Sequence, residues 1–160
     1  MKFTIKTIAE SVATHFSSLL PGVKWYEDPN QQGTQCPCAF LQLMSSDVKL
    51  RLSGRLLRTL RFDLTHLEDY NLPDLQRRYQ EVQEIIDENF ETFEYADGSK
   101  DEYDKPVTTI LRTYNRQASI DLDGLHYKFD LQIWLDPEED ENFMASAALF
   151  TEVKDGSKQN

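Results

Sequence analysis

The sequence predicts an α+β fold in which two helices pack on a mostly antiparallel sheet to form two layers. Three observations support this prediction: two stretches with apolar residues at helical spacing, strand-like stretches with alternating side chains, and an Asp123-Gly124 hairpin signal. A helix and a half-buried sheet each have one apolar face, and packing these faces together buries both.

The first helix is predicted from Ile5, Ile8, Val12, Phe16 and Leu19, which recur three or four residues apart. The pair Pro21-Gly22 ends it. A short strand over residues 23–27 and a loop over residues 29–37 are expected next.

Two strands joined by a turn are predicted between residues 39 and 66. The first, over residues 39–44, is expected to be buried on much of both faces, and Ser53-Gly54 is expected to form the turn. In the returning strand, over residues 58–66, apolar and polar side chains alternate. Its packed face is predicted to carry Leu60, Phe62 and Leu64, and its solvated face Arg61, Asp63 and Thr65.

A long second helix is predicted to begin at Asn71 or at Pro73-Asp74 and to end in a polar loop over residues 96–100. Its buried stripe is expected to comprise Leu75, Tyr79, Val82, Ile86, Phe90 and Phe93.

The closing hairpin, over residues 116–135, is predicted from Asp123-Gly124, which suits a two-residue type I′ turn. That register pairs Leu122 with Leu125, Ile120 with Tyr127 and Ala118 with Phe129. The hairpin is expected either to reach a neighbouring molecule or to be buried within its own domain.

The net charge of −11 is unevenly distributed. One basic stretch without an acidic residue contains Lys49, Arg51, Arg55, Arg58 and Arg61. Acidic residues concentrate over residues 84–104 and 136–141. Such a surface repels nucleic acid over most of its area, so no specific nucleic-acid binding is expected.

No catalytic, cofactor or metal site is predicted. His15, His66 and His126 lie in separate elements, and the phosphate-binding and hydrolase motifs are missing from the sequence. The acidic run over residues 136–141 is expected to be a solvated loop rather than a calcium site. Cys36 and Cys38 flank one proline, a poor arrangement for a disulfide, so two reduced thiols are expected. No apolar run is long enough for a membrane span, and a cytoplasmic protein is expected.

Short motifs in the first third of the chain resemble those of bacteriophage tail terminator proteins. They are Pro21-Gly22, Tyr26-Glu27, Gln32-Gly33 and, entering a strand, Pro37-Cys38-Ala39-Phe40. Ala39 departs from the aromatic residue that is usual there. The resemblance implies one tail-terminator-like α+β domain over residues 1–142, followed by a partly flexible C-terminal tail over residues 143–160.

The resemblance also implies a structural role without catalysis. Tail terminators form a ring, usually hexameric, that caps the head-proximal end of the tail tube and joins it to the connector or collar. In contractile tails and phage-derived bacteriocin particles, the ring also meets the sheath. The expected location is therefore a virion tail or tail-like particle made in the host bacterial cytoplasm. The alternatives are another head–tail connector or tail completion protein, or an acidic monomeric inhibitor or immunity-type protein.

A ring of identical subunits needs two complementary surfaces on each subunit. The basic residues Lys49, Arg51, Arg55, Arg58 and Arg61 are the candidates for one surface, and Glu84, Asp87, Glu88 and Glu91 for the other. The competing hypothesis is that these side chains are solvated or are paired within one subunit.

Overall fold

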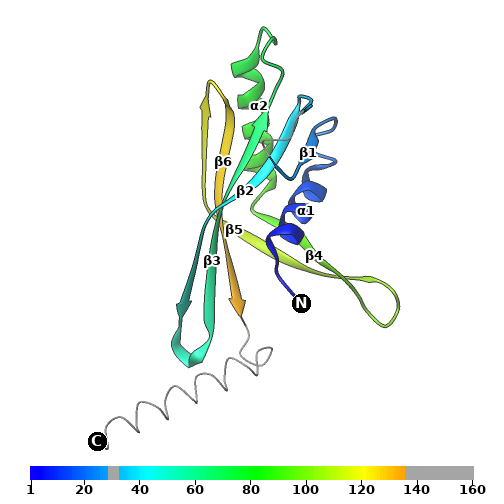
Figure 1. Cartoon of the computed structure of the whole chain (residues 1–160), viewed down its shortest axis with the longest axis vertical. Coiled ribbons are helices and arrows are strands. Elements are labelled where there is room, and N and C mark those ends of the chain that lie inside the picture. Colours follow the sequence, from blue (N-terminus) through cyan, green and yellow to red (C-terminus); the bar gives the residue numbers. More distant parts are fainter. Residues whose placement is uncertain (29–32, 136–160) are drawn as a thin grey trace, which may run out of the picture.

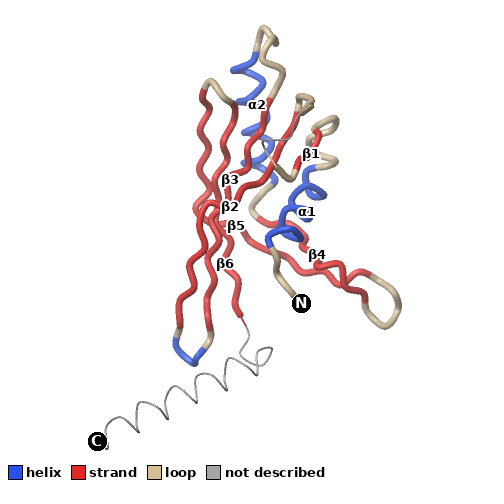
Figure 2. The backbone as a smooth tube through the Cα atoms, viewed as in Figure 1, coloured by secondary structure: helices blue, strands red, loops and turns tan. Residues whose placement is uncertain are grey.

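The computed structural model describes residues 1–28 and 33–135 of the chain. Its nine elements are α1 (Ile5–Phe16), β1 (Lys24–Tyr26), β2 (Cys38–Leu50), the short 3-10 turn η1 (Leu52–Gly54), β3 (Leu56–Leu67), α2 (Leu75–Asn89), β4 (Thr92–Lys100), β5 (Pro106–Asp121) and β6 (Gly124–Leu135). The strands form one six-stranded sheet in the order β1-β2-β3-β6-β5-β4 (Figure 2). Only the β1–β2 pair is parallel, which confirms the predicted α+β class.

Both helices share one core with the sheet. Strand β3 contributes the side chains of Leu60, Phe62 and Leu64 to this core, as predicted. Helix α1 contributes Ile8, Val12 and Phe16. Helix α2 contributes Tyr79, Val82 and Ile86. The start of α1 is fixed by a capping box in which Thr4 and Thr7 exchange side-chain and backbone hydrogen bonds.

The prediction that the second helix continues to residue 96 is wrong. Helix α2 ends at Asn89, and residues 92–100 form β4 instead of a helix end and a polar loop. Phe93 and Tyr95 are both buried with exposed Glu94 between them, which is the two-residue period of a strand. Because Phe90 and Phe93 are three residues apart, they also matched a helical stripe.

The register predicted for the closing hairpin is wrong by two residues. Ile120 pairs with Leu125 and Ala118 with Tyr127, so the predicted alternation is kept but Leu122 lies in the turn. The Asp121 Oδ1 atom accepts hydrogen bonds from the backbone N–H groups of Asp123 (2.8 Å) and Gly124 (3.1 Å), which closes the turn one step earlier.

Gly124 is required both by its backbone conformation, with a φ of 145°, and by close packing. A Cβ atom at this position would lie 2.8 Å from the backbone oxygen of His66 and 2.6 Å from Leu67 Cδ2. The closing hairpin thereby sits directly against β3, and β6 is an interior strand between β3 and β5. The hairpin does not project from the molecule.

Two other hairpins do project (Figure 1). The β2–β3 arm, defined as residues 44–61, extends to one end of the long axis, and the β4–β5 arm, defined as residues 96–110, extends sideways below α1. A bulge between Leu43 and Ser45 leaves Met44 without a partner on β3 at the base of the first arm. Strand β5 changes partner along its length, pairing with β4 over residues 106–112 and with β6 from Thr113 onward.

The prediction that residues 39–44 are buried on both faces holds only at the start of β2. Cys38, Ala39 and Phe40 are buried, but every residue from Gln42 to Leu50 is exposed. Strand β1 pairs with β2 only as far as Phe40, so the outer edge of β2 is unpaired beyond that point among the described residues.

Candidate subunit interface

The β2–β3 arm exposes apolar side chains that its own chain leaves uncovered. Leu52 at the tip is 96% exposed, Leu50 67% and Met44 53%. Single exposed leucines are common on protein surfaces, but a concentration of them on one projecting element is typical of an interaction site.

The five predicted basic residues all lie on this arm, but the structure engages them differently. Arg61, at the base, forms a 3.1 Å ion pair with Asp130. The Arg55 guanidinium lies 4.6 Å from the ring centroid of Trp134 on β6, a cation–π arrangement. The three others have weak contacts or none among the described residues: Lys49 reaches Asp47 at 3.5 Å, Arg58 reaches Ser46 at 3.5 Å, and Arg51 has no side-chain partner.

The four predicted acidic residues lie in the C-terminal half of α2 and just after its end. The Asp87 carboxylate accepts a 2.7 Å hydrogen bond from the hydroxyl of Tyr127, whose pKa is raised to about 12, mainly by burial and further by this carboxylate. Glu91 forms a 3.2 Å ion pair with Arg112. Glu84 and Glu88 are exposed and have no ion-pair partner in the described ranges.

The tip of the basic arm is at the bottom of Figure 1, whereas the C-terminal end of α2, which carries the acidic residues, leads into β4 near the middle of the molecule. These two surfaces are therefore not in contact within one chain. Contacts between them require a second copy.

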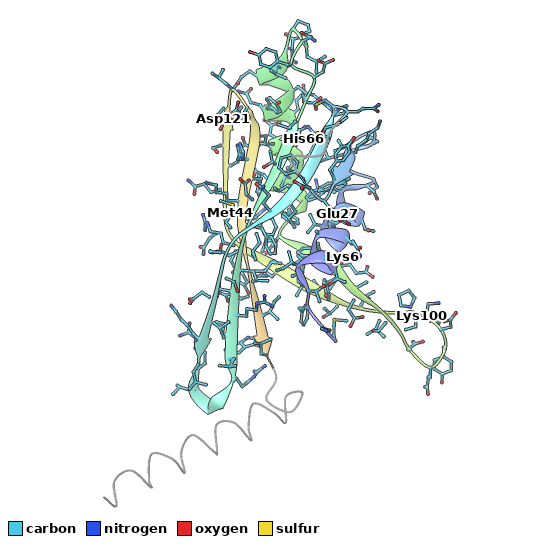
Figure 3. The ribbon with its side chains drawn as sticks, in the orientation of Figure 1. Lys6, Glu27, Met44, His66, Lys100 and Asp121 are labelled. Atoms are coloured by element: carbon cyan, nitrogen blue, oxygen red, sulfur yellow. The ribbon has the colours of Figure 1, made fainter. Side chains whose placement is uncertain are left out.

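A groove of about 440 Å³ runs between α1 and β1. Its lining is mainly apolar, with the small side chains of Ala9 and Ala13 on the helix side and Trp25 and Leu41 on the strand side. Charged residues at the groove are Lys6, Glu10 and Glu27, of which Lys6 is on α1 and Glu27 directly follows β1; Figure 3 labels these two residues. The Trp25 Nε1 atom is buried and has no hydrogen-bond acceptor among the described residues.

The family-motif loop has a structural role in joining β1 to β2. The backbone N–H of Gln35 donates to the Tyr26 hydroxyl at 3.1 Å, and the peptide bond between Cys36 and Pro37 is cis. Cys38 and Phe40 are buried at the start of β2, whereas Glu27 and Gly33 are exposed. Gln32 lies outside the described residues.

Both cysteines are free, as predicted. Cys36 is exposed and Cys38 is buried. The pKa of Cys38 is raised to about 12, first by burial and then by the adjacent Cys36. A thiol with so high a pKa is a poor nucleophile at neutral pH.

A buried polar cluster between β3 and α2 was not predicted from the sequence. Glu68 Oε1 lies 2.9 Å from both His66 Nε2 and Arg78 Nε, and the Glu68 backbone N–H donates to the Tyr79 hydroxyl at 3.0 Å. Burial lowers the pKa of His66, although the adjacent Glu68 opposes this shift. The spacing of His66, Glu68 and Arg78 carries no recognisable motif, so only the folded chain brings them together.

The second face of β3 is not solvated as predicted. Asp63 and Thr65 are buried, because neighbouring side chains on β6 cover them. His126 Nδ1 lies 3.0 Å from Asp63 Oδ2 and 3.3 Å from Thr65 Oγ1. Nearby, Asn115 and Arg61 both donate hydrogen bonds to the Asp130 carboxylate. This face therefore carries two hydrogen-bonded groups of side chains, one around Asp63 and one around Asp130.

Within residues 1–28 and 33–135, no three His, Cys, Asp or Glu side chains are grouped so as to hold a metal ion. None of the helices in the same ranges has the length and apolar character required to cross a membrane. The acidic run over residues 136–141 lies outside the described residues.

The family model described as phage tail terminator protein matches residues 5–142. No curated protein matches the chain.

Proposed function

The chain belongs to the phage tail terminator protein family, and from this membership we propose that its copies form a ring on the head-proximal end of a phage tail tube. The membership supports a structural role in tail assembly. In the proposed assembly the ring, usually of six subunits, caps the tube and joins it to the connector or collar. If the tail is contractile, the ring also contacts the last layer of sheath.

The observation that carries this proposal is the β2–β3 arm. It projects from the body, exposes Leu50 and Leu52, and presents Arg51 without a side-chain partner in the described part of the chain. A head-to-tail ring needs two different surfaces on each subunit. The arm is proposed as one, and the acidic end of α2 on the next subunit as its electrostatic complement.

Charge complementarity would act here mainly on the orientation and rate of assembly. Glu84 and Glu88 are the acids available for this contact, because Asp87 and Glu91 already contact Tyr127 and Arg112. Arg51, Arg55 and Arg58 are the corresponding bases on the arm, whereas Arg61 is held by Asp130 within its own subunit.

Labelling tests the position in the tail. A tag on this subunit, imaged in assembled tails by negative-stain electron microscopy, is expected at the head-proximal end of the tube. A label at the other end, or along the sheath, would contradict the proposal. A label within the neck but apart from the tube would favour the alternative of a connector or tail completion protein.

Charge exchange tests the ring contact. The double variant Glu84→Arg with Glu88→Arg should weaken ring assembly, and combining it with Arg51→Glu and Arg55→Glu should restore part of it. Native mass spectrometry measures the oligomers formed by the wild type, each double variant and the combined quadruple variant. A wild-type chain that remains monomeric, and does not bind tail tubes, would instead favour the acidic inhibitor class.

A further inference from the structure

Electrostatic pairing leaves the apolar tip of the β2–β3 arm unexplained. Leu50 and Leu52 are 67% and 96% exposed at the end of the β2–β3 ladder, whose β3 strand also pairs with β6. The acids on α2 offer them charge but no apolar cover. A complementary apolar surface is therefore needed elsewhere.

The groove between α1 and β1 has the matching properties. Its volume of about 440 Å³ is ample for two leucine side chains, and Ala9 and Ala13 leave its floor open. Glu10 and Glu27 lie at this groove, while Arg51 and Arg55 flank the tip leucine. Lys6 lies 4.0 Å from Glu10, so one of the acids is partly compensated within the chain.

A buried side-chain donor in the groove wall also lacks a partner. Trp25 Nε1 has no acceptor among the described residues, and its ring stacks on Phe16 at a centroid distance of 6.3 Å. Because this nitrogen is shielded from solvent, the wall of the groove keeps one unsatisfied donor among the described residues.

We propose that the tip of the β2–β3 arm, with Leu52 at its centre, inserts into the α1–β1 groove of an adjacent copy of the chain. This inference rests on the proposed ring and names the surface that receives the arm. The tip cannot enter the groove of its own chain, because Leu41 in the groove wall and Leu52 are separated by strand β2, and ten extended residues span roughly 33 Å. The tip and the groove are different surfaces, as a head-to-tail ring requires.

Disulfide trapping tests the contact in the full-length chain. In a Cys36→Ser background, Leu52→Cys with Ala9→Cys should give covalent oligomers under mild oxidation, seen as a ladder on a non-reducing gel. The matched control is Leu122→Cys with Ala9→Cys, because Leu122 is also a turn leucine and is 87% exposed. The control pair should give no ladder.

Filling the groove provides a test that does not depend on cysteine chemistry. Ala9→Trp should weaken self-association at least tenfold, measured by analytical ultracentrifugation, because the indole occupies the space proposed for Leu52. Thr14→Trp places the same side chain on α1 outside the groove and should leave association unchanged. Circular dichroism verifies that both variants fold.

The outcomes separate this inference from the proposed function. Intact rings without a specific cross-link, and with Ala9→Trp harmless, would overturn the arm-in-groove contact and leave the ring standing. A chain that stays monomeric at all concentrations, with or without tail tubes, would overturn both. A cross-link that appears only after residues 136–160 are removed would show that the C-terminal segment occupies the groove, and would also overturn the inference.

Discussion

The two projecting arms are both antiparallel hairpins, but their tips differ in how many of their side chains form hydrogen bonds or ion pairs within the tip. At the β4–β5 tip, the Asp101 carboxylate accepts hydrogen bonds of 2.9 Å from the backbone N–H groups of Tyr103 and Lys105, and Lys100 pairs with Asp104 at 2.8 Å. The β2–β3 tip is closed by two backbone hydrogen bonds that involve no side chain: Arg51 N–H donates to the Arg55 carbonyl at 2.8 Å, and Gly54 N–H donates to the Arg51 carbonyl at 3.3 Å. Its side chains are left for another molecule.

This difference indicates that the β2–β3 arm is the interface and that the β4–β5 tip is a turn whose polar groups already have partners within it. Polar groups that bond within one turn gain little from a partner, because binding would exchange one set of hydrogen bonds for another. Exposed leucines gain from any apolar cover, at about 25 cal/mol per Å² removed from water.

The largest expected effect comes from reversing charge at the basic tip. Arg51→Glu with Arg55→Glu should weaken ring assembly about 100-fold or more, because like charges placed in one interface cost several kcal/mol. Native mass spectrometry across a concentration series measures the loss.

Lys100→Glu with Lys105→Glu makes the same change in net charge at the β4–β5 tip. It should leave assembly within about twofold of wild type, since a change of that size is below 0.5 kcal/mol. Equal losses in the two double variants would mean that overall charge, and not the arm, controls association.

The sequence predicted this basic cluster but could not separate the two arms. Lys49 to Arg61 are adjacent in the chain, so their grouping needs no tertiary information. The second arm depends on β4, where Phe93 and Tyr95 alternate in the manner of a strand, although Phe90 and Phe93 also satisfy helical spacing. Over these few residues the sequence fits both the two-residue period of a strand and the spacing of a helix, and only packing against α1 decides between the two.

Tertiary contacts also explain the other errors. The shift of the closing hairpin follows from the Asp121 side chain and from the approach of Gly124 to His66, which lies far away in sequence. The burial of Asp63 and Thr65 depends on His126 from β6. Local alternation alone identifies which residues share a face, but not what covers that face.

A smaller effect is expected from truncating the side chain that stiffens the basic arm. Leu57 is 7% exposed and pairs with Trp134 across the ladder, so Leu57→Ala should lower the free energy of unfolding by about 2–3 kcal/mol. Ile110 on the β4–β5 arm is 62% exposed, and Ile110→Ala should cost less than about 0.5 kcal/mol. Urea denaturation gives both free energies of unfolding. Similar losses in the two variants would mean that the two arms do not differ in how much these side chains stabilise them.

The β4–β5 tip should depend on one carboxylate. Asp101→Ala removes the acceptor of two backbone hydrogen bonds and should cost about 1 kcal/mol, whereas the neighbouring exposed Glu102→Ala should be nearly neutral. Thermal denaturation measures both. If Asp101→Ala also weakened ring assembly, this tip would be an interface as well, and the contrast between the arms would fail.

Acid should affect the body that carries both arms before it affects either tip. Burial lowers the pKa of His66 below its ordinary 6.5, so the unfolded chain binds the proton more readily. The stability linked to His66 is therefore complete above pH 6.5 and is lost as pH falls below that value. His66→Gln should flatten this part of the pH–stability profile relative to His15→Gln, and an unchanged profile would contradict the assignment.

The bulge at Met44 is the one position in the β2–β3 ladder, among the described residues, where a single residue can be lost without a change of register. Deleting Met44 leaves Leu43 opposite Phe62 and Ser45 opposite Arg61, so every side chain farther along the arm keeps its side of the sheet. In the regular ladder beyond it, losing one residue exchanges the two sides, and only changes of two residues preserve them. Loss of this one residue would therefore remove the bulge while the tip keeps its place along β3 and the arm keeps the surface that it presents.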